Sequence, residues 1–134
     1  MTKKEARQQV KEWMKKLDKN YIEKADQSIF EQVKELKEFQ EAKTIFCYAS
    51  MKNEVDTWQL IASALKQGKI DMAVIPCVSA DREGRRLGHG AGFYDRFLDG
   101  VTFPKILVCY KELMMDQVPT EEHDILMDQV ICDE

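Results

Sequence analysis

The sixteen residues 81–96 carry the densest set of groups that could do chemistry, with four glycines, four arginines and two aspartates. Gly88, Gly90 and Gly92 remove side chains at alternate positions, so backbone N–H groups can turn toward an anion. A helix beginning near Gly92 would add the positive end of its dipole. The stretch matches neither G-x-G-x-x-G, because Phe93 takes the place of the last glycine, nor G-x-x-x-x-G-K-[ST]. It predicts a phosphate-binding loop of another kind.

A solvated glycine loop whose arginines merely face water is the alternative interpretation of 81–96. The surroundings favour phosphate binding, because the loop follows a predicted strand and leads into a predicted helix. It also concentrates positive charge in a chain that is acidic as a whole, with 20 Lys and Arg against 24 Asp and Glu. A net charge of −4 provides no global cationic field for nucleic acid or an anionic membrane.

Length and composition predict one domain over residues 1–134. The chain is 44% hydrophobic and 33% charged, which is typical of a soluble globular protein. Its start is charged, and its longest apolar stretch, 72–78, is far too short to span a bilayer. The four cysteines form no C-x-x-C pair, so we expect no metal cluster. Three of them, Cys47, Cys77 and Cys109, lie in or beside apolar runs and are expected to be buried free thiols in a reducing compartment. The sequence therefore predicts a cytoplasmic protein without membrane or nucleic-acid partners.

Helical spacing of apolar residues predicts three helices. Thr2 and Glu5 have the T-x-x-E spacing of a capping box, and the apolar stripe that follows continues to Leu17. A second stripe covers 21–36. A third helix is expected over 57–68, capped by a threonine at its start and a glycine at its end.

Short, continuously apolar runs predict strands covered on both faces, at 44–49, 72–76 and 105–110. A last small run at 130–132 could add an edge strand. Strands alternating with helices indicate an α/β fold with right-handed crossovers. Ligands of such sheets bind at the carboxyl ends of the strands, and 81–96 follows one of those ends.

Residues 81–96 resemble the hallmark D-x-x-G-x-R-L-G-x-G-x-G-[YF]-Y-D-R of the 5-formyltetrahydrofolate cyclo-ligase family, also called 5,10-methenyltetrahydrofolate synthetases. Three further blocks agree in order: KKEAR at 3–7, EVDT at 54–57 and PTEEHD at 119–124. The resemblance covers nearly the whole chain. It implies a three-layer α/β/α fold around a mostly parallel sheet, with the NagB/RpiA/CoA-transferase-like architecture.

The resemblance also implies a reaction. An enzyme of this family uses ATP and Mg²⁺ to cyclise 5-formyltetrahydrofolate to 5,10-methenyltetrahydrofolate, releasing ADP and phosphate. The γ-phosphoryl of ATP is transferred to the formyl oxygen, and N10 of the folate attacks the activated carbon. Such catalysis is mostly positioning and charge neutralisation. The implied partners are a reduced folate and ATP, and we expect a monomer.

Matched positions imply the site residues. Arg86 and Asp95 would be catalytic, and Asp95 and Asp124 would hold magnesium. The residues facing the folate would be Ala49, Glu54 and Tyr94. Those binding ATP would be Lys3, Lys4, Arg7, Arg86, Leu87, Gly88, His89, Gly90, Ala91, Gly92, Phe93 and Tyr94.

Several of these residues have a purely structural alternative. Lys3 and Lys4 could be solvated charges at the end of a helix. Asp124 could be only a turn or helix-cap residue. Asp95 could pair with a neighbouring arginine, and exposed pairs of that kind contribute little.

The main departure from the family is that Lys69 is followed directly by Ile70, where the family carries several dozen further residues. Smaller ones are Cys77, Ala91 and the segment after Tyr110. The segment absent after Lys69 supplies a strand, a hairpin and a loop that help enclose the folate. Either the sequence omits a segment or the protein is a shortened paralogue. Cyclo-ligase activity is therefore the leading hypothesis, and a non-catalytic nucleotide- or folate-binding paralogue is the alternative.

Overall fold

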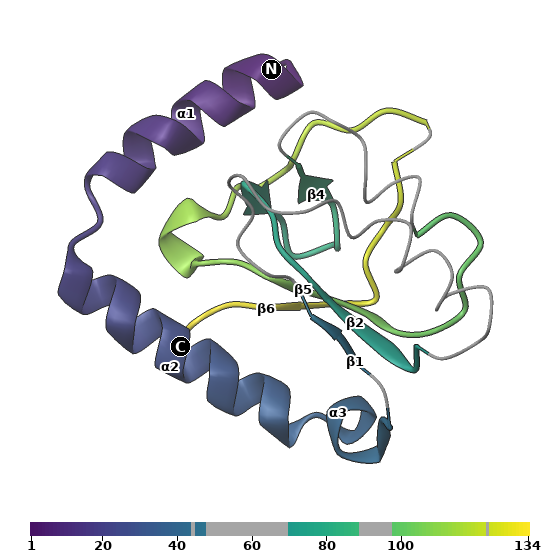
Figure 1. The fold of residues 1–134 in the computed structure, drawn as a ribbon. Coiled ribbons are helices and arrows are strands. Elements are labelled where there is room, and N and C mark those ends of the chain that lie inside the picture. Colours follow the sequence, from purple (N-terminus) through teal and green to yellow (C-terminus); the bar gives the residue numbers. More distant parts are fainter. Residues whose placement is uncertain (44, 48–69, 89–97, 123) are drawn as a thin grey trace, which may run out of the picture.

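The computed structural model describes residues 1–43, 45–47, 70–88, 98–122 and 124–134 (Figure 1). Its elements, in chain order, are α1 (Lys3–Lys15), α2 (Lys19–Glu35), α3 (Lys37–Glu41), β1 (Ile45–Cys47), β2 (Met72–Ile75), β3 (Ser79–Ala80), β4 (Arg86–Leu87), β5 (Lys105–Val108), the 3₁₀ turn η1 (Lys111–Leu113) and β6 (Gln129–Ile131). The helices expected over 57–68 and near residue 92 lie outside the described residues. Within those residues, no helix combines the length and apolar character needed to cross a membrane.

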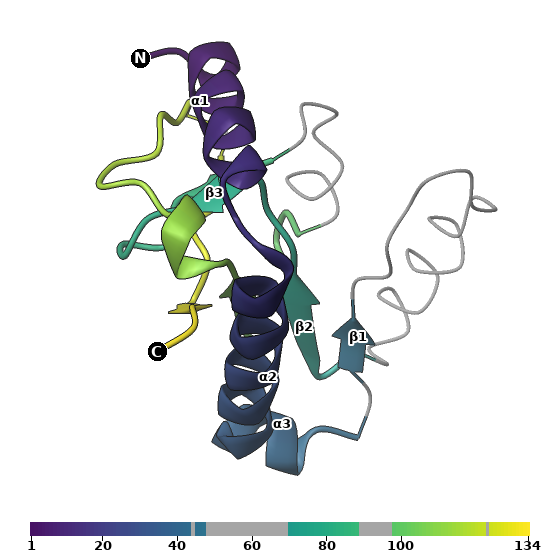
Figure 2. The same cartoon turned by 90° about the vertical axis from the view of Figure 1, so that its left-hand side faces the viewer.

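Four strands form one parallel sheet in the order β1-β2-β5-β6 (Figures 1 and 2). Val74 of β2 lies opposite Cys47 on one side and Ile106 on the other. Leu107 of β5 lies opposite Val130 of β6. The predicted α/β class with a mostly parallel sheet is confirmed, and the carboxyl ends of its four strands meet at one edge.

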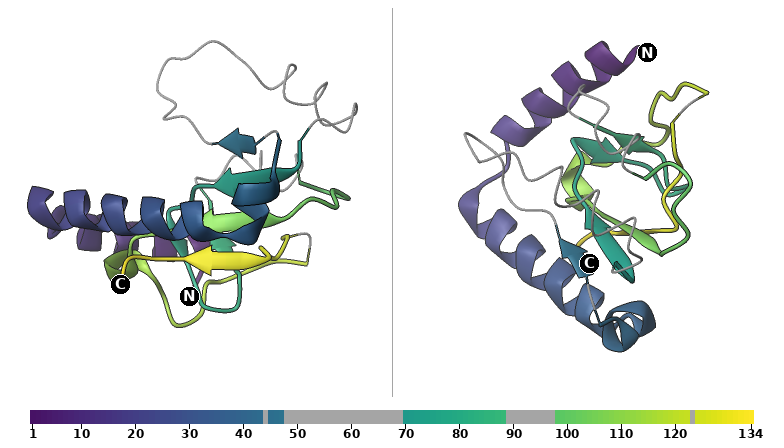
Figure 3. Two further views of the ribbon diagram at one scale, coloured as in Figure 1. Left: turned by 90° about the horizontal axis from the view of Figure 1, so that it is seen from below. Right: turned by 45° about the vertical axis from the view of Figure 1, so that its right-hand side comes forward.

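Alternate residues of β2 pack on opposite faces of the sheet, as the two-residue period of a strand requires. Ala73 and Ile75 belong to a cluster that includes the buried side of α1. Met72 and Val74 belong to a second cluster, together with Val33 of α2. The helix α2 runs alongside the strands (Figures 2 and 3). The sheet therefore has an apolar layer on each face, which explains why its strands are apolar without interruption.

The first two helices each begin directly after a residue whose side chain caps the helix. Thr2 Oγ1 accepts the Glu5 N–H at 3.1 Å, and the Glu5 carboxylate accepts the Thr2 N–H at 3.1 Å, so the predicted capping box is confirmed. Asp18 caps α2 by accepting the Tyr21 N–H at 2.7 Å. Leu36, expected as the end of a helix, has extended backbone angles and separates α2 from the short α3.

Candidate functional site

The candidate site is built on the hairpin of β3 and β4, which follows β2 at the carboxyl edge of the sheet. Ser79 pairs with Leu87, and Ala80 pairs with Arg86. Arg86 Nε donates to the carbonyl of Pro76, the residue after β2, at 2.6 Å. Each strand has only two residues, too few for a periodic pattern, so sequence reasoning missed the hairpin. It nevertheless places the Arg86 guanidinium at the edge where parallel sheets bind their ligands.

Gly88 lies directly against that guanidinium. A Cβ atom at position 88 would stand 2.7 Å from Nη1 of Arg86 and 3.4 Å from its Cζ. Arg7, on α1, donates from Nε to the Gly88 carbonyl at 2.8 Å. The helix α1 therefore docks on the hairpin (Figure 2), and two arginine side chains each lie against Gly88, where the predicted phosphate loop begins.

A second contact of α1 reaches the segment before β6. Lys3 Nζ lies 2.7 Å from Oδ2 and 3.0 Å from Oδ1 of Asp124, and 3.7 Å from a Glu121 carboxylate oxygen. Asp124 Oδ2 also accepts the Glu121 N–H at 2.8 Å, so Asp124 does make the turn contact of its structural alternative. Lys3 and Arg7 are four residues apart and share one face of α1, which brings two positive charges to the same side of the site.

The remaining predicted site residues divide into two groups. Lys4 is exposed, and the structure does not bring it to Asp124. The Leu87 side chain is fully buried in the core, so any contact of this residue with a ligand falls to its backbone. The others lie outside the described residues: Ala49, Glu54, His89, Gly90, Ala91, Gly92, Phe93, Tyr94 and Asp95.

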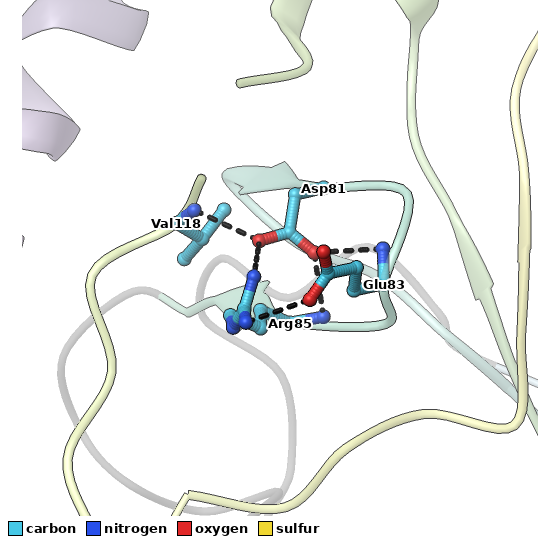
Figure 4. A network of polar contacts seen from close by, with 4 residues as sticks. All are labelled: Asp81, Glu83, Arg85 and Val118. Carbon is cyan, nitrogen blue, oxygen red and sulfur yellow. Dashed lines mark hydrogen bonds and ion pairs between the residues drawn. The ribbon is translucent and has the colours of Figure 1, made fainter. Parts of the chain in front are cut away.

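Sequence reasoning assigned no role to Asp81, although its carboxylate accepts hydrogen bonds from Glu83, Arg85 and Val118 (Figure 4). Oδ1 accepts the N–H groups of Glu83 and Arg85 at 3.0 and 3.1 Å. Oδ2 accepts the Val118 N–H at 2.9 Å and Nη1 of Arg85 at 3.1 Å. Burial alone would raise the Asp81 pKa, but these hydrogen bonds outweigh it and lower the pKa below its ordinary value of 3.8. An aspartate after a strand with glycine three residues later is the turn signal that could have identified it.

A magnesium ion would find suitable chemistry at Asp124. Mg²⁺ is bound in many phosphate-handling sites by one or two carboxylates together with phosphate oxygens and water. The Asp124 side chain is only 9% exposed, and the Lys3 ammonium balances its charge. Across the described ranges, no three His, Cys, Asp or Glu side chains lie close enough together to hold a metal ion. Within those ranges, a metal ion would therefore need ligands other than protein side chains as well. Asp124 has the right donor type for an ion that arrives with a phosphate ligand, but both of its oxygens are held by Lys3, and Oδ2 also by the Glu121 N–H, so an ion would have to share or displace these contacts.

Comparison with known proteins shows which family the chain is similar to. The model of the 5-formyltetrahydrofolate cyclo-ligase family matches the chain in two parts, residues 1–70 and 62–133. A solved structure of a 5,10-methenyltetrahydrofolate synthetase from Mycoplasma pneumoniae superimposes with a TM-score of 0.75 and 28% identity, covering 100% of both chains.

Two curated relatives show how the lengths compare. A 5-formyltetrahydrofolate cyclo-ligase of Mycolicibacterium smegmatis is 41% identical over 66 residues, which are 48% of this chain and 34% of the relative. The matched stretch thus spans about a third of that relative's length. A probable 5-formyltetrahydrofolate cyclo-ligase of Caenorhabditis elegans is 26% identical over 188 aligned positions, covering 96% of this chain and 91% of the relative. That alignment exceeds the 134 residues here, so it includes positions without a counterpart in this chain.

Proposed function

Because this chain belongs to the 5-formyltetrahydrofolate cyclo-ligase family, we propose that it uses ATP and Mg²⁺ to convert 5-formyltetrahydrofolate into 5,10-methenyltetrahydrofolate, with release of ADP and phosphate. One observation carries the proposal. Arg7 from α1 and Arg86 from β4 bring two guanidinium groups to Gly88 at the carboxyl edge of the parallel sheet, and Lys3 of α1 lies beside them in an ion pair with Asp124. Arginines held in this way are suited to binding the phosphates of a nucleotide.

In this proposal the chain's own residues bind and orient the phosphates. Arg86 is anchored at the Pro76 carbonyl and Arg7 at the Gly88 carbonyl, so both guanidinium groups are held before the nucleotide arrives. Charges fixed in advance stabilise the transferring phosphoryl group without reorganising during the reaction. Transfer of the γ-phosphoryl to the formyl oxygen makes that oxygen a good leaving group. Attack of N10 on the activated carbon then closes the ring, N10 gives up its proton to solvent, and the C–O bond breaks as the formyl oxygen departs with the phosphate.

The magnesium site is proposed on Asp95 and Asp124, as the family resemblance implies. When bound, the ion would neutralise charge on the phosphate oxygens. Asp124 contributes a carboxylate held by Lys3 and the Glu121 N–H. We also propose a cytoplasmic location, on the composition and charge of the chain, and a monomer whose partners are the folate and ATP that the family resemblance implies.

A second function is favoured by one observation, the aligned positions of the nematode relative that this chain lacks. If the segment missing after Lys69 is needed to enclose the folate, the protein would bind nucleotide or folate without turnover. The positive groups of the proposed nucleotide site lie on α1 and β4, apart from that junction, so nucleotide binding is expected under both functions.

A conversion assay tests the proposal. Purified protein is mixed with MgATP and 5-formyltetrahydrofolate, and the methenyl product is followed by its ultraviolet absorbance. Product that requires both ATP and Mg²⁺ establishes the ligase activity. Absence of product from folded protein that still binds MgADP supports the non-catalytic alternative, and an intact mass above 15.6 kDa would reveal a segment beyond the given sequence.

We expect Gly88→Ala to weaken nucleotide binding far more than it weakens the fold. The added Cβ would meet the end of the Arg86 side chain at 2.7 Å, and its three nearest contacts all belong to that side chain. The guanidinium must therefore shift, whereas the backbone need not. Calorimetry should show MgADP affinity reduced about tenfold, and urea unfolding should show a stability loss of about 1 kcal/mol or less. If the MgADP affinity of Gly88→Ala is unchanged, the Arg86 guanidinium does not contribute to phosphate binding.

A further inference from the structure

We propose that Asp81 is a positioning residue for the nucleotide site, because its carboxylate holds the segment that carries Asp124 in register with the strand that carries Arg86. We call residues 119–122 and 124–126 the Asp124 loop. This inference rests on the proposed function, since it concerns the same site. It adds a residue to which neither the family resemblance nor the comparisons give a role.

Both ends of the Asp124 loop are fastened to one turn. At its start, the Val118 N–H donates to Asp81 Oδ2 at 2.9 Å. At its end, the Met127 N–H donates to the Gly84 carbonyl at 2.9 Å. Asp81 and Gly84 are three residues apart in the turn between β3 and β4, and the Gly84 N–H donates to the Asp81 carbonyl at 3.2 Å. The position of the loop is therefore determined by the position of this turn.

The same turn also fixes the backbone position of Arg86, the first residue of β4. Asp81 Oδ1 accepts the N–H groups of Glu83 and Arg85, and the Asp81 N–H donates to the Arg85 carbonyl at 3.1 Å. Arg86 is the next residue along the chain. One side chain thus joins the two backbone segments that carry Arg86 and Asp124, and its 1% exposure protects these bonds from competition by water.

The helix α1 closes this arrangement into a ring. Its Lys3 contacts Asp124, and its Arg7 contacts the Gly88 carbonyl just beyond β4. The ring runs from α1 through the Asp124 loop and the hairpin turn to β4, and back to α1. If the bond between Asp81 and Val118 is lost, the Asp124 loop stays tied to the turn only at its far end, through Met127 and Gly84, and the separation between Asp124 and the two arginines is less closely fixed. A nucleotide that must contact all of them would then bind less well.

The two oxygens of Asp81 have different partners, and this permits a selective substitution. Oδ1 serves the turn, whereas Oδ2 serves the Val118 N–H and the Arg85 guanidinium. In Asp81→Asn, the amide oxygen can take the place of Oδ1 and keep the turn. Its NH₂ group then faces the Val118 N–H, so two donors oppose each other and the tie to the Asp124 loop is broken.

The experiment compares wild-type protein and Asp81→Asn in MgADP binding by calorimetry and in amide hydrogen exchange by NMR. We expect MgADP to bind about tenfold more weakly to the variant, the effect of losing one hydrogen bond to a charged group. The Val118 amide should exchange at least about tenfold faster, whereas the Glu83 and Arg85 amides stay protected. Where turnover is measurable, the KM for MgATP should rise about tenfold and the KM for the folate should stay within about twofold.

Glu83→Gln is the matched control, because it removes one negative charge from the same turn and leaves the contact between Asp81 and Val118 intact. We expect its MgADP affinity to stay within about twofold of wild type. Replacement of the Val118 amide by an ester deletes only the donor N–H and keeps the contact of Asp81 with Arg85. This ester variant should weaken MgADP binding as Asp81→Asn does, and it carries the test if Asp81→Asn does not fold.

The outcomes separate this inference from the proposed function. Wild-type protein that does not bind MgADP would overturn the nucleotide site and the positioning role together. Wild-type protein that binds MgADP, with Asp81→Asn and the ester variant binding equally well, would overturn the positioning role alone. Equal weakening in Glu83→Gln would also overturn it, because the effect would then come from charge.

Discussion

Arg86→Ala is expected to lower MgATP-dependent formation of the methenyl product by about 10³-fold or more, the effect of removing an arginine that stabilises a transferring phosphoryl group. Its Nε is anchored at 2.6 Å on the Pro76 carbonyl, and its guanidinium lies against Gly88 at the carboxyl edge of the sheet. The substitution removes that anchor, a charge-assisted contact worth about 2 kcal/mol, less than the stability of a typical domain, so the protein should remain folded. Initial rates at saturating folate and varied MgATP measure the effect, and circular dichroism checks the fold.

Two variants make the Arg86 result specific. Arg82→Ala removes an exposed arginine from the same hairpin turn and should leave the rate within about twofold of wild type. Arg86→Lys keeps the charge but loses the planar fork that spans carbonyl and phosphate, so it should recover only a small part of the rate. Full turnover in Arg86→Ala would show that Arg86 is not catalytic.

Gly84→Ala is expected to cost about 3 kcal/mol of unfolding free energy, a large part of the 5–15 kcal/mol typical of a domain. Gly84 has φ +95°, a conformation that side chains rarely adopt. Its added Cβ would also stand 2.6 Å from the Met127 carbonyl oxygen and 3.4 Å from the Met127 nitrogen. Both neighbours are backbone atoms, so no rotation of a side chain can relieve the clash. Urea unfolding followed by circular dichroism measures the loss.

Gly100→Ala separates the two causes. Gly100 also has positive φ, +74°, but a Cβ there would meet nothing within 4 Å. Gly100→Ala should therefore lose only about 1 kcal/mol of unfolding free energy, the cost of placing a side chain on backbone with positive φ. A loss in Gly84→Ala no larger than in Gly100→Ala would mean that the segment at Met127 yields, and the Asp124 loop would not be held rigidly at that end.

The sequence by itself determined the elements whose causes are local. Thr2 and Glu5 place the start of α1 because their reciprocal bonds involve residues three apart. Apolar runs predicted β2 and β5 because strands covered on both faces need apolar residues at successive positions. The close approach at Gly88 also has a local cause, since its missing side chain leaves the room that the Arg86 guanidinium occupies.

Only the tertiary structure decided which distant groups meet. Lys3 contacts Asp124 across 121 residues, and Arg7 contacts Gly88 across 81. The sequence left Asp124 with two interpretations, a metal ligand or a turn residue, and the structure shows a turn contact joined to an ion pair with α1. No periodicity in the chain encodes such contacts, because they depend on which strand lies beside which in the folded sheet.

Asp81 makes contacts of both kinds, local ones that the sequence can predict and a long-range one that it cannot. Its bonds to Glu83 and Arg85 lie within four residues and could have been predicted as a turn. Its bond to Val118 crosses 37 residues and exists only because the hairpin and the Asp124 loop pack side by side. Short-range hydrogen bonds follow from neighbouring residue types, whereas long-range bonds follow from the packing of the whole chain.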